Sequence, residues 1–535
     1  MNQTARYDDI VIGGGANGLV AATTLARAGR RVLLLEREEA LGGQGRLIEF
    51  APGFRAAPLG LDPGWLPPVI AAAVGIQTLE RVPSFDAGVG VALDGSGFLS
   101  VPRDPRQAAK TIAPHSAADA AKWPEFVARL RTLAGFLESL YTTPAPDISA
   151  SSLNELLPLL GLGRRFRALG RRDMIEFLRT LPLSVWDLLD DWFESAPLKA
   201  AVAPGGIQDH QQGPRSGGTA FVLLHYLVGA PAGSVRGRTP WRGGAEAFTI
   251  AAEQAARAAG VTIRTGAAVA RIPVKADAIQ GVVLENAEEI ASSTVLSTAN
   301  PVNTLLGWID PVWLDPEFIR ELRNVRHRGC AAIVLYALER LPDLPGLKSA
   351  DALAGVISLT PTVAALEKAA DAAKYGTVSE RPHVEITVPT LLAPNLATGS
   401  SHVMVAKAQY APHRLRDGAA WDGTRRDALA KSVTAAIEAV SPCFTSRILH
   451  QVTLTPLDLE ERFWLREGAA SQGELGLDQI LFMRPIAGWG NHRTPIDGLF
   501  LGGAGSHPGP GILGGAGWLA AKRMLGDRRG ADRRW

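Results

Sequence analysis

The chain has 535 residues, of which 46% are hydrophobic and 20% charged, so it can bury several cores and is not a disordered protein. Its formal net charge of +2 is too balanced to favour a nucleic acid partner. Its two cysteines, Cys330 and Cys443, stand far apart, which excludes a disulfide framework and argues against disulfide-reductase chemistry that needs a close redox pair.

The first residues do not form a signal peptide, because no basic segment followed by an apolar run and a cleavage site occurs there. No run of about 18 or more apolar residues suggests a membrane span. We therefore expect a cytoplasmic protein. Two arginine clusters predict either a solvated surface or contact with anionic lipid headgroups, so membrane association stays open. The clusters comprise Arg164, Arg165, Arg167, Arg171 and Arg172, and Arg528, Arg529, Arg533 and Arg534.

The N-terminus carries a dinucleotide-binding fingerprint. An apolar run over residues 9–12 predicts a buried parallel strand, and three glycines in GxGxxG spacing follow it before a predicted helix over 19–28. The glycines permit a tight turn, close approach to a pyrophosphate and close packing of helix on strand, while the helix N-terminus offers free N–H groups to the phosphates. The binding residues predicted in this turn are Gly13, Gly15, Ala16, Asn17 and Gly18.

A second strand, predicted over residues 31–35, ends in Glu36. An acidic residue at this position can accept hydrogen bonds from ribose hydroxyls, which favours FAD or NAD over NADP. A Gly pair at 42–43 then favours FAD, because in many flavoproteins it lets the chain pass close to the FAD diphosphate. The FAD contacts predicted in this segment are Glu36, Arg37, Gly42, Gly43, Gln44 and Arg46.

The middle of the chain predicts two further units. Residues 105–200 predict helices, because apolar side chains from Phe126 to Leu140 recur at i, i+3, i+4 and i+7. This stripe indicates either an ordinary core face or a lid or membrane-touching helix. Apolar runs over 331–337, 383–388 and 403–408 predict strands of a mixed sheet, which would form the floor of a substrate pocket.

Between these two units the pattern returns to alternating helix and strands. A Gly pair at 243–244 precedes an alanine-rich helix predicted over 245–259. The strands predicted after this helix span 261–266, 268–272, 282–285 and 294–297.

A Gly-Ser-Gly sequence at 95–97 predicts a β-hairpin turn rather than a second phosphate-binding loop.

The C-terminus carries a second glycine-rich strand–turn–helix pattern, with a strand over 498–501 and a helix beginning near 518. So many glycines are costly unless the backbone must contact a ligand, and the free N–H groups of the turn suit a flavin. The FAD contacts predicted here are Gly503, Ala504, Gly511, Ile512 and Leu513.

Together the two ends resemble the phytoene desaturase family of FAD-dependent oxidoreductases, and within it the bacterial relatives of pyridine nucleotide-disulfide oxidoreductase domain-containing protein 2. The resemblance implies that Val269 contacts adenine through its backbone. Two departures bear on substrate specificity: many relatives have Arg at the position of Gln44, for which Arg46 could substitute, and Arg-Asn at the position of Trp518-Leu519. The matching stretches are IVIGGGANGLVAATTLARAGRRVLLLE (10–36), FESAPLKA (193–200), GGTAFVLLH (217–225), RGGAEAF (242–248), LDQILFMRP (477–485) and LFLGGAGSHPGPGILG (499–514).

The expected fold is α/β, with a discontinuous Rossmann-like FAD-binding domain and an α+β substrate domain that contains a mixed sheet and a helical subdomain. The FAD-binding domain is expected over residues 1–70, 235–310 and 465–535. The substrate-binding domain is expected over 71–234 and 311–464, with its helical part at about 105–200.

The expected function is an FAD-dependent dehydrogenase, desaturase or oxidase, in which a hydride passes from a C–C or C–N bond of an apolar small molecule to the flavin N5. The sequence indicates no separate NAD(P)H-binding domain, so oxygen or a quinone is the expected electron acceptor. His225 and His507 are candidate proton acceptors, although each position favours a structural or pocket-lining histidine. No His/Cys spacing suggests a metal. A redox-neutral isomerase or hydratase and a non-catalytic FAD-binding protein remain alternatives, and the oligomeric state is open.

Overall fold

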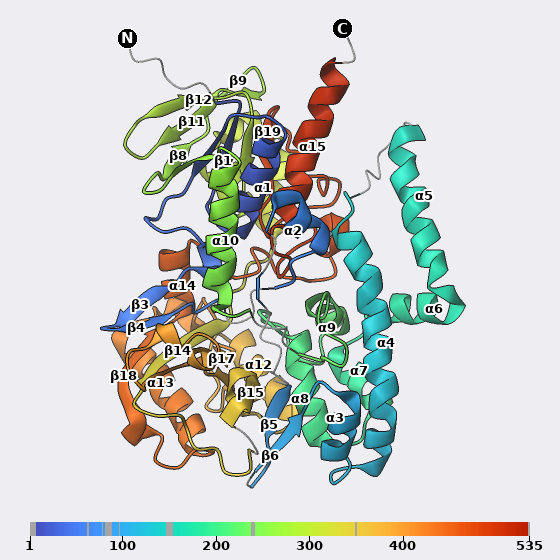
Figure 1. Ribbon diagram of the computed structural model, residues 1–535, viewed down its shortest axis with the longest axis vertical. Coiled ribbons are helices and arrows are strands. Elements are labelled where there is room, and N and C mark those ends of the chain that lie inside the picture. Colours follow the sequence, from blue (N-terminus) through green and yellow to red (C-terminus); the bar gives the residue numbers. More distant parts are fainter. Residues whose placement is uncertain are drawn as a thin grey trace.

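The computed structural model describes residues 7–60, 64–76, 79–80, 88–95, 97–145, 153–236, 241–347 and 350–532. Its upper half, as drawn in Figure 1, is built on a parallel five-stranded sheet in the order β19-β13-β1-β2-β7. The strands come from three distant parts of the chain: β1 (Asp9–Ile12), β2 (Val32–Leu35), β7 (Thr262–Arg264), β13 (Val295–Ser297) and β19 (Leu499–Leu501).

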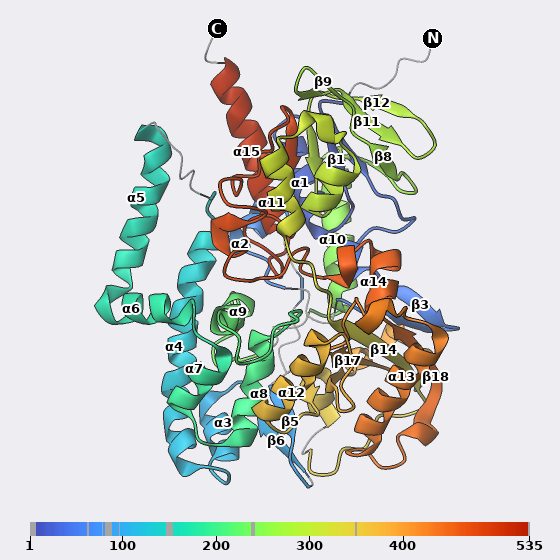
Figure 2. The same ribbon diagram turned by 180° about the vertical axis from the view of Figure 1, so that it is seen from behind.

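Both faces of this sheet are covered, which explains why its strands are continuous apolar runs rather than alternating ones. Val11 faces a core shared with three long helices and the short helix α2 (Pro68–Val74), whereas Ile10 and Ile12 face the opposite core. Helix α1 lies between the other two long helices on its face (Figures 1 and 2). The three long helices are α1 (Ala16–Arg27), α10 (Gly244–Ala258) and α15 (Gly515–Asp532).

The opposite face packs against a small three-stranded sheet and helix α11 (Pro316–Asn324). The small sheet comprises β8 (Val269–Arg271), β11 (Gly281–Leu284) and β12 (Glu289–Ala291). Helix α11 falls in the segment predicted for the substrate domain, yet Phe318 and Leu322 pack with Ile10 and Leu33 in the cofactor core. The core beneath the parallel sheet therefore includes side chains from beyond residue 310, and the division into two domains stays a prediction.

A seven-stranded mixed sheet forms the lower half, in the order β18-β14-β17-β16-β15-β5-β6. All its neighbouring strands are antiparallel except β15 and β5, which are parallel. One face packs against α13 (Gly423–Glu438), and the other faces a cavity below the cofactor domain. The strands are β5 (Val89–Ala92), β6 (Phe98–Val101), β14 (Ala331–Leu338), β15 (Val356–Ser358), β16 (His383–Thr387), β17 (His402–Gln409) and β18 (Ile448–Leu454).

Helices fill the remaining side of the molecule, as predicted for residues 105–200. The apolar stripe from Phe126 to Leu137 is buried against α7 and α9 in a core, so its helix serves as an ordinary core helix. The helices are α3 (Pro105–Ile112), α4 (Ala117–Tyr141), α5 (Leu153–Ala168), α6 (Gly170–Thr180), α7 (Val185–Trp192), α8 (Ala196–Val202) and α9 (Thr219–Tyr226).

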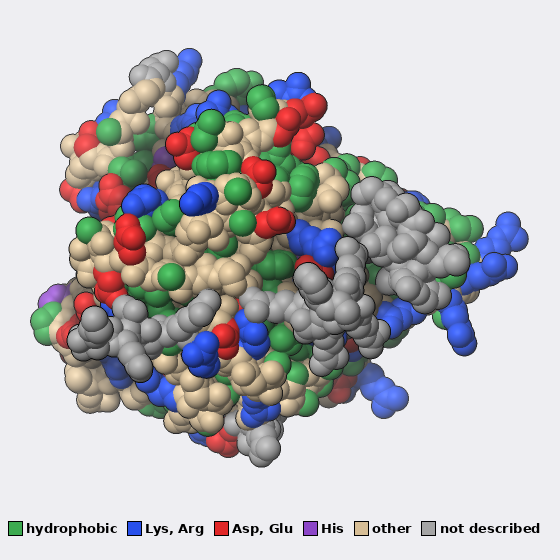
Figure 3. All heavy atoms as spheres, turned by 90° about the horizontal axis from the view of Figure 1, so that it is seen from above, with side chains coloured by type: hydrophobic (Ala, Val, Ile, Leu, Met, Phe, Trp, Pro, Cys, Tyr) green, Lys and Arg blue, Asp and Glu red, His purple; other side chains and the backbone are tan. Residues whose placement is uncertain are grey.

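Helices α5 and α6 project away from the rest of the molecule (Figures 1 and 2). The first arginine cluster is exposed on them, and Figure 3 shows Lys and Arg side chains standing out on this side. The side chains of the second cluster lie outside the described residues. In the part of the chain that the structure describes, no helix is long and apolar enough to cross a bilayer. Contact of these arginines with a membrane stays a prediction.

The predicted α/β fold class is confirmed. The five parallel strands all lie within the three segments predicted for the FAD-binding domain, and the seven strands of the mixed sheet all lie within the two predicted for the substrate domain. The predicted turn at 95–97 joins the antiparallel strands β5 and β6, although Ser96 lies outside the described residues.

Candidate functional site

A groove of about 190 Å³ runs past the N-terminus of α1 and the C-terminal glycine-rich loop. It gathers residues from both ends of the chain, because β1 and β19 flank β13 in one sheet and their following turns open at the same edge. Of the predicted FAD contacts, the groove is lined by Ala16, Asn17, Gly42, Gln44, Ala504, Gly511, Ile512 and Leu513.

The backbone around the groove fits a dinucleotide. No side chain caps the N-terminus of α1 and no acidic residue lies in its first turn, so its N–H groups are available to a diphosphate. Gly15 and Gly43 bring their two loops together, since a Cβ on Gly43 would lie 3.1 Å from the Gly15 Cα. A Cβ on Gly503 would lie 2.3 Å from the Thr298 carbonyl oxygen. Side chains at these positions would therefore clash with the neighbouring backbone and push apart the loops that form the groove.

Glu36 stands at the end of β2, as the fingerprint requires, and is buried. Its carboxylate accepts hydrogen bonds from the backbone N–H groups of Gly14 (2.6 Å) and Glu38 (3.0 Å). Burial raises the pKa of Glu36, and the same two N–H groups oppose that rise. Glu36 thus holds the glycine turn in place through the Gly14 N–H group. A hydrogen bond from Glu36 to the ribose remains a prediction.

Three predicted contacts are engaged elsewhere. The Arg37 guanidinium lies over the Trp464 ring, 3.1 Å from its centroid, and Arg46 pairs with Glu38. Val269 is buried in β8 and lines neither the groove nor the adjoining cavity among the described residues. A contact of these three residues with FAD therefore rests on the sequence alone.

The C-terminal loop is held from behind by Arg484, whose side chain is fully buried. Its guanidinium donates hydrogen bonds to four backbone carbonyls, one of which belongs to Ala504 in the groove wall. The other three acceptors are the carbonyls of Ser471, Gly473 and Gln479. Burial lowers the pKa of Arg484 to about 10, so the group remains a cation at neutral pH. Sequence reasoning had left this residue without a specific role.

Gln44 lies where the groove opens into a second, larger cavity of about 240 Å³. Its side-chain amide donates a hydrogen bond to the Ala470 carbonyl at 2.7 Å. The proposed substitute for the missing arginine, Arg46, does not line either space in the described part of the chain. The residues shared by the two spaces are Gln44, Leu59, Gly60, Ala245, Ala470, Pro510 and Gly511.

The larger cavity has apolar walls and a charged floor. Leu47, Leu392 and Leu396 are among its wall residues. The floor is the face of the mixed sheet on which Lys407 of β17 and Glu385 of β16 lie side by side. Each of these two pairs with a residue from outside the sheet, which leaves no buried charge in the floor uncompensated.

The two floor pairs involve residues that sequence reasoning missed. Glu385 pairs with Arg236, and Lys407 pairs with Asp209. Burial disfavours both charged forms, but Arg236 holds the pKa of Glu385 well below its usual value. Asp209 and Glu385 likewise offset burial and raise the pKa of Lys407. The available signal was a charged residue inside an apolar strand, in HVEITV and VMVAKAQ.

Glu385→Gln is expected to lower the free energy of unfolding at pH 7 by about 2–3 kcal/mol, because Arg236 would stay buried without its counter-charge. The folded pKa of Glu385 is depressed, so its stabilisation is present above its ordinary pKa of 4.5 and is lost as the pH falls below it. Urea unfolding at pH 7 and pH 4 should therefore show a smaller difference between variant and wild type at pH 4. Glu317→Gln, which alters an exposed pair with Arg320, is the matched control. Equal stability of Glu385→Gln and wild type at pH 7 would contradict this prediction.

His225 lies behind the C-terminal loop and His507 belongs to it, and neither lines the groove or the cavity among the described residues. His225 Nε2 donates to the Pro510 carbonyl at 2.8 Å, which leaves Nδ1 to accept from the Tyr141 hydroxyl at 2.6 Å. His507 is buried 3.3 Å from the Thr143 carbonyl, and burial lowers its pKa. This placement suits histidines that position the loop, and a catalytic role for either remains a prediction.

Comparison with known proteins agrees with this geometry. Residues 11–62 match the model of the NAD(P)-binding Rossmann-like domain. The chain is 31% identical to pyridine nucleotide-disulfide oxidoreductase domain-containing protein 2 of Rattus norvegicus, over 97% of this chain and 94% of that protein. The chain belongs to this protein's family. The family is one of oxidoreductases, and the predicted cofactor, FAD, fits the dinucleotide-binding fold that residues 11–62 share with the matched domain.

More distant matches cover the chain equally well. The phytoene dehydrogenase of Streptomyces griseus is 26% identical over 97% of this chain and 95% of that protein. A structure of putrescine oxidase superposes with a TM-score of 0.60 at 15% identity, covering 97% of this chain and 99% of that one. The latter similarity establishes the fold alone. Despite the family's name, Cys330 is buried and Cys443 exposed, and both are free thiols.

Proposed function

We propose that this protein is a dehydrogenase, desaturase or oxidase that acts on a C–C or C–N single bond of a largely apolar small molecule. The observation that carries the proposal is the continuity between the FAD groove and the larger cavity, which share a wall at Gln44, Pro510 and Gly511. A molecule in the larger cavity would therefore meet the end of the cofactor. The similarity to a phytoene dehydrogenase supports the same reaction class.

When bound, FAD supplies the capacity to accept a hydride from a substrate carbon. The protein's own residues bind and orient the reactants around it. The N-terminus of α1 would hold the diphosphate, and the Arg484 clamp fixes the loop that contains Ala504. The apolar walls around Leu47 and Leu392 would exclude water from the reacting bond. We propose oxygen or a quinone as the electron acceptor, because the sequence predicts no separate NAD(P)H-binding domain beside the FAD-binding one.

The visible spectrum of the purified protein tests this proposal. We expect a bound flavin whose absorbance bleaches on anaerobic incubation with one class of a panel that contains polyenes, amines, fatty alcohols and NAD(P)H. Free FAD mixed with the same compounds is the control for direct reduction. Bleaching by NAD(P)H alone, or by no compound, would contradict the proposed oxidation and shift weight to a redox-neutral or non-catalytic role.

A further inference from the structure

The pair formed by Lys407 and Asp209 is the part of the cavity floor with unused hydrogen-bonding capacity. An ammonium group has three N–H donors, and in the described part of the chain Lys407 uses one of them, toward Asp209. The Asp209 carboxylate likewise accepts from Lys407 alone among the described residues. The neighbouring Arg236 and Glu385 differ, since two guanidinium nitrogens donate to the two carboxylate oxygens and satisfy one another.

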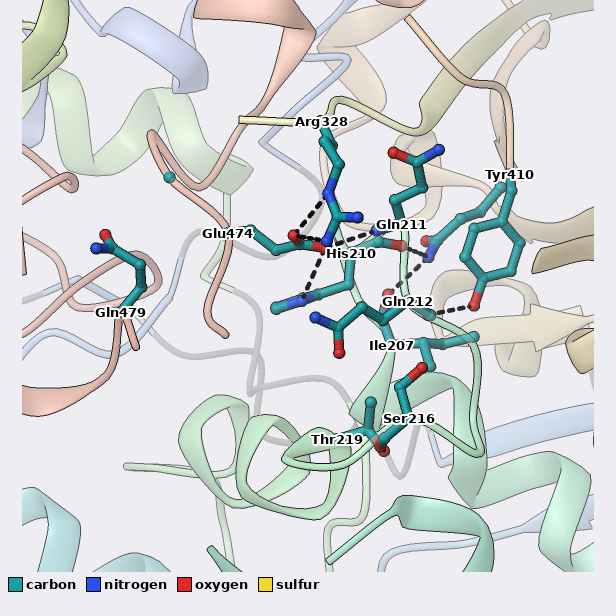
Figure 4. A network of polar contacts seen from close by, with 12 residues as sticks. Ile207, His210, Gln211, Gln212, Ser216, Thr219, Arg328, Tyr410, Glu474 and Gln479 are labelled. Atoms are coloured by element: carbon teal, nitrogen blue, oxygen red, sulfur yellow. Dashed lines mark hydrogen bonds and ion pairs between the residues drawn. The ribbon is translucent and has the colours of Figure 1, made fainter. Parts of the chain in front are cut away.

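The loop that carries Asp209 is held in place by its backbone (Figure 4). The Gln409 amide donates to the carbonyls of Ile207 (2.6 Å) and His210 (3.0 Å). The Tyr410 hydroxyl donates to the Gln212 carbonyl at 2.9 Å. Asp209 itself has a φ of 58°, a left-handed conformation that non-glycine residues adopt at an energetic cost. The surrounding contacts therefore hold its carboxylate against Lys407 before any ligand binds.

An ion pair between the buried Glu474 and the partly exposed Arg328 anchors this loop from the other side. Glu474 accepts a hydrogen bond from the Gln211 backbone N–H at 3.2 Å and from the Arg328 guanidinium, and the His210 ring lies 3.7 Å away (Figure 4). Burial lowers the pKa of His210, which favours its neutral form. The loop is thus fixed by neighbours on both sides, which makes the pair beside the cavity preorganised.

The charges around the cavity are balanced, and this balance restricts the ligand. Among the described residues that line it, three cations face three carboxylates. A ligand that brought a net charge into this cavity would remain without a counter-charge, which is unfavourable away from bulk water. A neutral hydroxyl or carbonyl group would instead accept from Lys407, and a hydroxyl could also donate to Asp209. The six charged residues are Arg103, Arg236, Lys407, Asp209, Glu246 and Glu385.

We propose that Lys407 and Asp209 determine substrate specificity by selecting an apolar molecule that carries a neutral hydroxyl or carbonyl group. The inference rests on the proposed function in taking the larger cavity as the substrate site. It narrows the substrate class, since neither a plain hydrocarbon nor a charged amine or carboxylate would satisfy this pair.

The preference can be measured by calorimetric titration of the FAD-loaded protein with four probes of equal chain length: octan-1-ol, 1-octene, octylamine and octanoate. We expect wild type to bind octan-1-ol about tenfold more tightly than each of the other three, the effect of one to two net hydrogen bonds. Equal binding of 1-octene, or tighter binding of either charged probe, would overturn the proposal.

Two variants give shifts in opposite directions. Lys407→Met removes the counter-charge of the Asp209 carboxylate, so the affinity for octylamine relative to octan-1-ol should rise about tenfold. Asp209→Asn removes the counter-charge of the Lys407 ammonium, so the affinity for octanoate relative to octan-1-ol should rise by a similar factor. A general loosening of the cavity would change binding of all four probes alike, and that result, or unchanged preferences, would overturn the proposal.

Lys374→Met is the matched control, because Lys374 pairs with Asp371 on the exposed surface of α12 (Val363–Lys374) and should change no preference. The visible flavin spectrum reports whether each variant folds and retains FAD. These titrations need no turnover. A failure of flavin reduction with every donor would therefore contradict the proposed reaction while leaving the selectivity of the pair measurable.

Discussion

Gly18→Ala is expected to abolish retention of FAD through purification and to weaken its binding by at least about a hundredfold. A Cβ at this position would lie 1.8 Å from the Gly13 carbonyl oxygen, a backbone atom that cannot rotate away. Helix α1 would have to withdraw from β1, which moves its N-terminal N–H groups away from the diphosphate. Overpacking of this kind costs about 3 kcal/mol, which corresponds to a hundredfold loss of affinity.

The ratio of flavin to protein absorbance after gel filtration gives the first readout, and titration of the apoprotein with FAD gives the dissociation constant. Gly135→Ala is the matched control, because a Cβ at Gly135 in α4 meets no atom within 4 Å. That change should leave FAD binding unaltered and raise helix stability slightly. An unchanged dissociation constant in Gly18→Ala would mean that the groove beside α1 is not the FAD site.

Arg484→Met is expected to lower the free energy of unfolding by about 3–5 kcal/mol and to weaken FAD binding with it. The substitution keeps the approximate volume but removes every donor to four buried carbonyls, and each unsatisfied acceptor is costly. One of these carbonyls belongs to Ala504, so the groove wall should loosen together with the segment around Gly473.

Urea unfolding of apoprotein and FAD-loaded protein separates the two effects, since a bound ligand adds stability only in the folded state. Arg484→Lys should recover part of the loss, because an ammonium keeps the charge but offers fewer donors than a guanidinium fork. Arg425→Met, which removes an exposed pair with Asp422, should change stability by less than about 1 kcal/mol. A loss of similar size in Arg425→Met and Arg484→Met would contradict a specific role for the clamp.

The larger cavity, which we propose as the substrate site, combines apolar walls with a charged floor. The sequence predicted an apolar substrate, and the walls at Leu47 and Leu396 agree with a largely apolar body. The paired charges of Lys407 and Asp209 add a polar feature at the floor.

The sequence by itself determined the cofactor and the fold that holds it. The strand, the GxGxxG turn, the helix and Glu36 are contiguous, and each signal arises from local rules about backbone conformation and apolar periodicity. The C-terminal loop could be predicted for the same reason, because its excess of glycine has meaning only where a backbone approaches a ligand. Ala504 and Gly511 accordingly lie in the groove wall.

Only the tertiary structure decided which side chains meet in the larger cavity. Asp209 and Lys407 are 198 residues apart, and Arg236 and Glu385 are 149 apart, so no local spacing connects them. Strand pairing places Glu385 beside Lys407, and the loop after η2 (Ala203–Gly206) delivers Asp209 to the same face. His225 is an example of the opposite kind. Its place in a family-like stretch suggested a proton acceptor, but packing turns its ring toward Tyr141 and Pro510. Side-chain direction follows from packing between distant segments, which a single sequence read locally does not contain.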